Sequence, residues 1–120
     1  MPRRDRLDHD KIAPLLALTE MGEQDRAGEV VNLFLDSFAG QLDCLLDHVA
    51  RGDLDRLRDV SRNLRRSSAS VGASMLETRC AEMESLARTG TTCFMTAAMA
   101  GILDEFRAVR PELEALTTAA

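Results

Sequence analysis

Apolar residues recur at intervals of three and four through most of this 120-residue chain, which is the spacing of one face of an α-helix. The longest such stripe lies between residues 27 and 49 and predicts a long helix. It consists of Ala27, Val31, Phe34, Phe38, Leu42, Leu45 and Val49. Gly52 follows as the residue expected to end this helix, and Asp53 can cap the next one.

Three further stripes predict helices downstream of this one. They cover residues 54–71, 73–87 and 94–116. Gly72 marks the boundary between the first two, and the sequence "RTG" ends the second. Thr91 or Thr92 can cap the last helix. Pro111 lacks a backbone N–H and disfavours helix at the residue before it, so we expect a kink or a restart there.

A shorter helix is predicted before the long one. Asp10 can cap it, Pro14 is tolerated in its opening turn, and Gly22 ends it. Its apolar contacts come from Leu15, Leu16 and Leu18.

The fold class follows from the periodicity and from the connections. No segment alternates with a period of two, and the turns are short, so neighbouring helices should run antiparallel. We expect one all-α domain over residues 1–120, with its core at about 8–116. It should be an up-down four-helix bundle with the short first helix packed across one end. The residues expected in its core include Leu42, Leu45, Leu57, Leu64, Leu76, Cys80 and Phe106.

Composition narrows the function classes. The net charge is −5, which argues against general binding of nucleic acid. Cys44, Cys80 and Cys93 show no C-x-x-C spacing and no neighbouring histidines, so we expect neither a metal site nor a cofactor. The basic N-terminus has no apolar run behind it, and no apolar stretch approaches the roughly 18 residues of a membrane span. We therefore expect a cytoplasmic protein without a membrane partner.

Four arginines are expected on the outer side of the helix at residues 54–71, opposite its apolar stripe. They are Arg58, Arg62, Arg65 and Arg66. A strip of this kind is either a solvated helix face or a docking surface for an acidic partner. Arginine suits the second role because its planar fork binds carboxylate or phosphate at two points. We expect all four side chains to be exposed to solvent.

The same helix carries a motif. Residues 61–68 read Ser-Arg-Asn-Leu-Arg-Arg-Ser-Ser, followed by Gly72-Ala73 and Leu76, and "CAEME" occupies 80–84. Upstream lie "VVNLFLDSF" and "VARGDLDRLRDVS". Over about residues 8–116 this pattern resembles the histidine-containing phosphotransfer (HPt) domain of two-component phosphorelays, whose helix reads roughly A-H-x-L-K-G-S-S and then G-A-x-x-L. The resemblance implies a helical bundle that docks with receiver domains.

The departures from the family pattern fall on its functional positions. By the resemblance, Arg62 stands at the phosphoacceptor position, Arg65 replaces a lysine and Arg66 replaces a glycine. Phosphotransfer needs a neutral imidazole nitrogen as nucleophile. A guanidinium has no free lone pair for this reaction and stays charged at physiological pH. His9 and His48 lack the surroundings of the motif and are not expected to substitute.

These observations predict a degenerate HPt-like protein that is not an enzyme. It should bind a response-regulator receiver domain or a hybrid histidine kinase without accepting phosphate. The candidate partner-binding residues are Arg58, Arg62, Arg65, Arg66 and Ala69, and no catalytic residue is expected. Two alternatives remain open. One is an active phosphotransfer protein in which Arg62 is an engineered substitution. The other is a helical interaction or dimerisation module, which an exposed apolar patch on the second helix or on the Met-containing helices would favour. The oligomeric state does not follow from the sequence.

Overall fold

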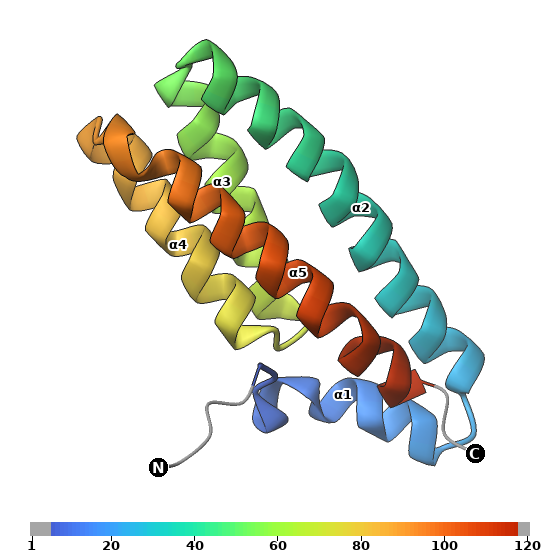
Figure 1. The fold of residues 1–120 in the computed structure, drawn as a ribbon. Coiled ribbons are helices and arrows are strands. Elements are labelled where there is room, and N and C mark those ends of the chain that lie inside the picture. The colour runs from blue at the N-terminus through green and yellow to red at the C-terminus, as the bar shows by residue number, and fades with distance from the viewer. Residues whose placement is uncertain (1–5, 118–120) are drawn as a thin grey trace.

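The computed structural model describes residues 6–117, and for Gln24 it describes only the backbone. Most of these residues belong to five α-helices and one short 3-10 helix. The elements are α1 (His9–Glu20), α2 (Gln24–Arg51), α3 (Leu54–Ser70), α4 (Ser74–Thr89), η1 (Thr92–Phe94) and α5 (Met95–Thr117). The described residues contain no strand. Helices α2 to α5 lie side by side and α1 crosses one end of them (Figure 1). The predicted bundle with an additional short helix is therefore confirmed.

The helices pack in a closed ring. Helix α3 contacts α2 and α4, and α5 contacts the same two helices, so α3 and α5 occupy diagonal positions. Helix α1 packs against α2 and α5. This arrangement places the outer face of α3 beside α4, which matters for the candidate site. Within residues 6–117, no helix combines the length and the apolar character needed to cross a membrane.

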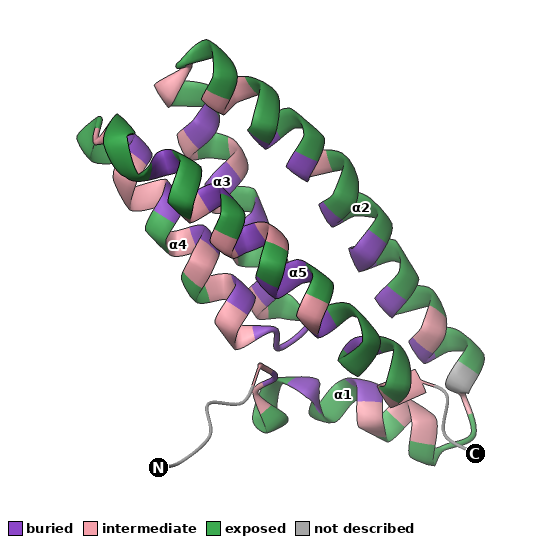
Figure 2. Ribbon diagram, in the orientation of Figure 1, coloured by how far each residue is buried: buried purple, intermediate pink, exposed green. Residues whose placement is uncertain are grey.

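The core forms where the apolar stripes meet, and Figure 2 shows the buried positions facing the interior of the bundle. All the residues expected there are buried: Leu42, Leu45, Leu57, Leu64, Leu76, Cys80 and Phe106. Phe38 of α2 stacks on Phe106 of α5, with 4.7 Å between the ring centroids. Each fully buried leucine or phenylalanine removes enough apolar surface from water to contribute about 1.5–3 kcal/mol, so the stripes account for the bundle.

The helix ends follow glycine and aspartate chemistry. Gly52 ends α2 with a φ of 67°, and the Asp53 carboxylate accepts a hydrogen bond from the Arg56 N–H at 3.2 Å, as expected. Gly72, between α3 and α4, has a φ of 74° and also lies close to α1. A Cβ there would come within 2.7 Å of Ile12 Cγ2, so the turn at residue 72 has no room for a side chain.

One expected detail of the helix termini is wrong, and a second is confirmed only in part. The cap of α1 is Asp8, whose carboxylate accepts from the Asp10 N–H at 3.0 Å, while Asp10 lies inside the first turn. The physical reason is tertiary, because the Asp8 N–H donates to the Gly72 carbonyl at 2.7 Å and fixes where the helix begins. Thr91 stands at the N-cap position of η1, as expected, but its side chain makes no capping hydrogen bond, and its hydroxyl pairs with that of Thr89.

Two expectations about α5 are also corrected. No restart occurs at Pro111, because α5 continues through it to Thr117. Pro111 and Arg107 are both exposed, so water can solvate the carbonyl that the proline leaves without its helical donor. Phe94, placed in the apolar stripe, is 61% exposed, because it belongs to η1, where the chain has not yet entered the register of α5.

Candidate functional site

The arginine strip lies along the outer side of α3, but only partly as expected. Arg66 is exposed, whereas the other members of the candidate set, Arg58, Arg62, Arg65 and Ala69, are half-buried. The side chains of Arg58 and Arg62 are each 40% exposed and that of Arg65 is 33% exposed. The expectation that all four arginines are exposed to solvent is therefore confirmed for Arg66 and holds only in part for the other three.

The reason for this partial burial is Glu84 on the neighbouring helix α4. Its Oε1 lies 2.6 Å from Arg65 Nε, and its Oε2 lies 3.4 Å from Arg62 Nε. The Glu84 side chain is only 12% exposed, so the two arginines fold toward α4 and cover it. One carboxylate thus connects the middle of α3 to the middle of α4. The helical periodicity of α3 could not predict this contact, because Glu84 lies on another helix, in the "CAEME" segment.

The electrostatics of this triad are mutual. The hydrogen bond from Arg65, together with the positive charges of Arg65 and Arg62, holds the pKa of Glu84 below its usual value, against the opposing effect of partial burial. The same hydrogen bond raises the pKa of Arg65. Glu84 is therefore ionised at neutral pH, and a guanidinium is charged at any physiological pH. Two positive charges and one negative charge leave the triad with a net charge of +1.

The two remaining arginines add positive charge to the same strip. Among the described residues, Arg66 has no hydrogen-bond or ion-pair partner. Arg58 has only a distant one, since its Nε lies 4.0 Å from Asp59 Oδ1. That nitrogen is buried and makes no hydrogen bond. The strip therefore keeps cationic groups that an acidic partner could pair.

Three buried hydroxyl and thiol groups near the strip are not activated as nucleophiles. Ser61 and Ser68 are buried in α3, and their hydroxyls donate to the carbonyls of Leu57 at 2.7 Å and Leu64 at 2.8 Å. Burial raises the pKa of the Cys80 thiol to about 12, so it stays protonated.

The two histidines belong to other elements, since His9 begins α1 and His48 lies in the last turn of α2. Over residues 6–117, no group of three or more His, Cys, Asp or Glu is arranged to hold a metal ion.

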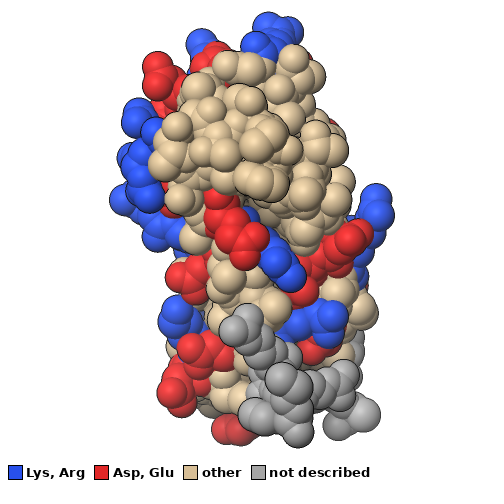
Figure 3. All heavy atoms as spheres, turned by 60° about the vertical axis from the view of Figure 1, so that its left-hand side comes forward, with Lys and Arg blue, Asp and Glu red and all other residues tan. Residues whose placement is uncertain are grey.

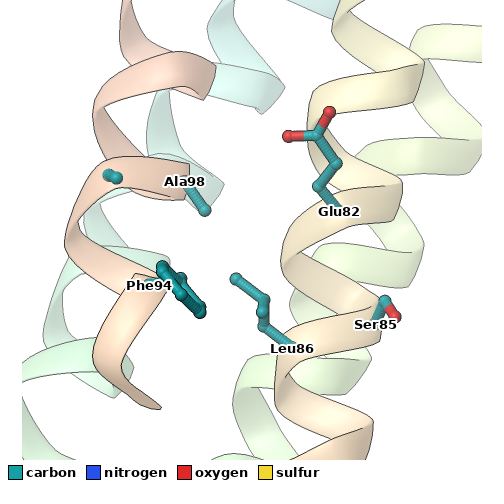
Figure 4. Close-up of a pocket in the computed structure, with 6 residues that line it drawn as sticks. Glu82, Ser85, Leu86, Phe94 and Ala98 are labelled. Carbon is teal, nitrogen blue, oxygen red and sulfur yellow. The ribbon is translucent and has the colours of Figure 1, made fainter. Parts of the chain in front are cut away.

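Sequence reasoning missed an apolar hollow between α4 and α5. Its volume is about 460 Å³, and Leu86, Phe94 and Ala98 line it together with Glu82, Ser85 and Ala97 (Figure 4). A second hollow of about 350 Å³ lies between α2 and α5, with Leu46 on its wall. Figure 3 shows a broad area without charged side chains in the upper half of that view. Phe94 falls in the apolar stripe expected for the last helix, so its spacing could not indicate that this ring lies at the surface and lines a hollow.

Comparisons with known proteins agree with this architecture. The sequence model described as "Hpt domain" matches residues 29–119. The chain superimposes on the histidine-containing phosphotransfer protein HptB from Pseudomonas aeruginosa PAO1 with a TM-score of 0.81 and 23% identity, over 96% of each chain. It also superimposes on a putative histidine-containing phosphotransfer protein from rice with a TM-score of 0.81 and 20% identity, over 93% of this chain and 79% of that one. At these identities the two likenesses establish a shared fold. No curated protein matches the chain significantly.

Proposed function

The chain belongs to the Hpt domain family, whose members serve histidine phosphotransfer in two-component phosphorelays, and we propose that this member binds receiver domains without accepting phosphate. The proposal is carried by Arg62, which stands at the phosphoacceptor position by the resemblance of residues 61–68 to the family motif. Arg62 lies in the middle of α3, on its outer side, and its guanidinium is held by Glu84. In this reading the protein is not an enzyme but a docking partner.

The chemistry of the site supports the missing transfer step. A phosphoryl group would have to be taken from a phospho-aspartate by a neutral nitrogen nucleophile, and a guanidinium has no lone pair to offer. The nearby hydroxyls of Ser61 and Ser68 are buried and already donate to carbonyls of their own helix. Cys80 is buried and protonated. None of these three groups therefore offers a substitute for the imidazole.

The charge of the strip supports the binding step. Receiver domains carry acidic residues around their phosphorylation site, and an arginine fork can bind a carboxylate at two points. Arg66 is exposed and without a partner among the described residues, so it is available for such a contact. The proposed partner is the receiver domain of a response regulator or of a hybrid histidine kinase. We do not expect nucleic acid to be a partner, because the chain carries a net charge of −5.

The proposal is tested with purified receiver domains encoded in the same genome, by calorimetric binding and by transfer of labelled phosphate. We expect binding without labelling. Arg66→Glu should weaken binding several-fold by charge reversal. Arg107→Glu is the matched control, because Arg107 is exposed on α5, diagonal to α3. Labelling of the wild-type chain would contradict the proposal, and so would equal losses from the two reversals.

A second candidate function, a helical interaction or dimerisation module, is favoured by exposed apolar side chains. Leu33 on α2 is 72% exposed, Leu46 on the same helix is 44% exposed, and Phe94 is 61% exposed. Such side chains on a charged protein are candidates for contact with another apolar surface. Sedimentation velocity over a wide range of protein concentrations tests this candidate. Concentration-dependent dimers that Leu33→Glu or Phe94→Glu abolishes would support it, and a monomer throughout would reject self-association.

A further inference from the structure

Glu84 is the most enclosed member of the charged triad on the α3–α4 face. Its side chain is 12% exposed, against 40% for Arg62 and 33% for Arg65. Neither arginine has another hydrogen-bond or ion-pair partner among the described residues. An anion that approaches from solvent therefore meets two arginines that already share one carboxylate.

We propose that Glu84 is an internal competitor that lowers the affinity of Arg62 and Arg65 for anionic partner groups, and so sets how tightly the arginine strip binds. This rests on the proposed function in one respect, namely that the natural anionic groups are the carboxylates of a receiver domain. Glu84 touches the arginines rather than the partner, so it acts on binding through them.

Two physical arguments both predict that Glu84 lowers the affinity of the arginines for an anion. If a partner carboxylate displaces Glu84, the Glu84 charge loses both of its ion pairs at a partly buried position, which is costly. If the partner carboxylate binds beside Glu84, the two like charges repel across a partly buried site, where screening by water is incomplete. Either way the partner gains less from the arginines than it would from an unpaired pair. The lowered pKa of Glu84 keeps the competitor ionised at neutral pH.

The competing interpretation is that Glu84 only connects α3 to α4. That interpretation predicts a loss of stability on substitution and no change in anion affinity. A third interpretation, in which Glu84 orients the arginines for binding, predicts weaker binding on substitution. The three interpretations therefore predict different changes in anion affinity when Glu84 is substituted, namely an increase, no change and a decrease.

The experiment uses Glu84→Gln, which keeps the shape and one acceptor oxygen but removes the charge. Glu82→Gln is the matched control, because Glu82 is on the same helix and pairs with Arg79 instead. The probe is inorganic phosphate, titrated at neutral pH into ¹⁵N-labelled protein while the Nε–Hε signals of the arginines are followed. We expect phosphate to bind Glu84→Gln roughly threefold to tenfold more tightly than wild type, and Glu82→Gln to bind like wild type.

Equal or weaker phosphate affinity in Glu84→Gln, or no detectable binding by either protein, would overturn the proposal. A lower melting temperature with unchanged affinity would assign Glu84 a purely structural role and overturn it as well. Receiver domains form the second arm, where Glu84→Gln should bind more tightly than wild type. A gain for phosphate with no receiver bound by any variant would refute the proposed function and still support the role of Glu84 toward anions.

Discussion

Arg62→His combined with Arg66→Gly is expected to turn this chain into a phosphoacceptor. The first change supplies the imidazole that the reaction needs. The second removes a long, exposed side chain one helical turn further along the same face, where the family has glycine. Residues four apart on a helix have Cβ atoms about 5–6 Å apart, so we expect the arginine side chain to crowd a receiver loop that must reach position 62.

The size of the effect follows from the geometry of in-line transfer. A displacement of about 1 Å between reacting atoms can reduce the rate on the order of a hundredfold. If Arg66 holds the receiver loop away by that distance, Arg62→His alone should be labelled about a hundredfold more slowly than the double variant. Glu84 will lie beside the new imidazole and will favour its charged form, so transfer should accelerate as pH rises through the imidazole pKa.

The assay is a labelling time course from a cognate phospho-receiver, with acid lability to identify phosphohistidine. Wild type, both single variants and the double variant are compared. Arg62→His with Arg66→Ala is the control for backbone effects, because glycine inside a helix costs about 1 kcal/mol relative to alanine. This control should be labelled like the glycine variant.

Three outcomes would refute parts of this reasoning. A double variant that is never labelled, although it binds the receiver, would show that position 62 is not an acceptor site. Phosphate labelling of the wild-type chain would refute the proposal that it binds receiver domains without accepting phosphate. A fully active Arg62→His would remove the steric role of Arg66. It would also show that a single substitution separates this chain from an active phosphotransfer protein.

Four further predictions concern stability and thiol chemistry. Leu45→Ala should lower the free energy of unfolding in urea by about 2–5 kcal/mol, because Leu45 is fully buried. Leu33→Ala, at an exposed position, should change it by no more than about 0.5 kcal/mol. Equal losses would contradict the assigned core. Gly72→Ala should cost at least about 1–2 kcal/mol because its φ is 74° and its Cβ would meet α1; an unchanged midpoint would refute the close approach. Cys80 should resist a thiol reagent in the native state, because burial raises its pKa to about 12, while the two exposed thiols react; three equally fast thiols would speak against it. The pKa of Glu84 is lowered from 4.5, so the stabilising contribution of the Glu84 carboxylate is present above pH 4.5 and is lost as pH falls through its folded-state pKa. The difference in stability between wild type and Glu84→Gln should therefore shrink over that pH range. A difference that stays constant with pH would argue against the ion pairs.

The amino-acid sequence by itself determined the helices and most of the core. Burial of Leu45, Leu64 and Phe106 followed from three-four spacing, because a helical stripe has only one side on which to pack. The turn at Gly52-Asp53 was predictable for a local reason, since left-handed backbone and N-capping need particular residue types. The motif around Arg62 likewise lies within one helix.

The tertiary structure decided what the site is made of. Glu84 is 22 positions from Arg62 along the chain, and only the packing of α4 on α3 brings its carboxylate to the arginines. Helical periodicity distinguishes an inner from an outer side, but it does not identify which outer residue of one helix lies beside which outer residue of the next. For the same reason the cap of α1 is Asp8 and not Asp10, because the Asp8 N–H donates to the Gly72 carbonyl in the turn between α3 and α4. Local chemistry therefore predicted the scaffold, and contacts between distant segments set the charge and exposure of the arginine strip.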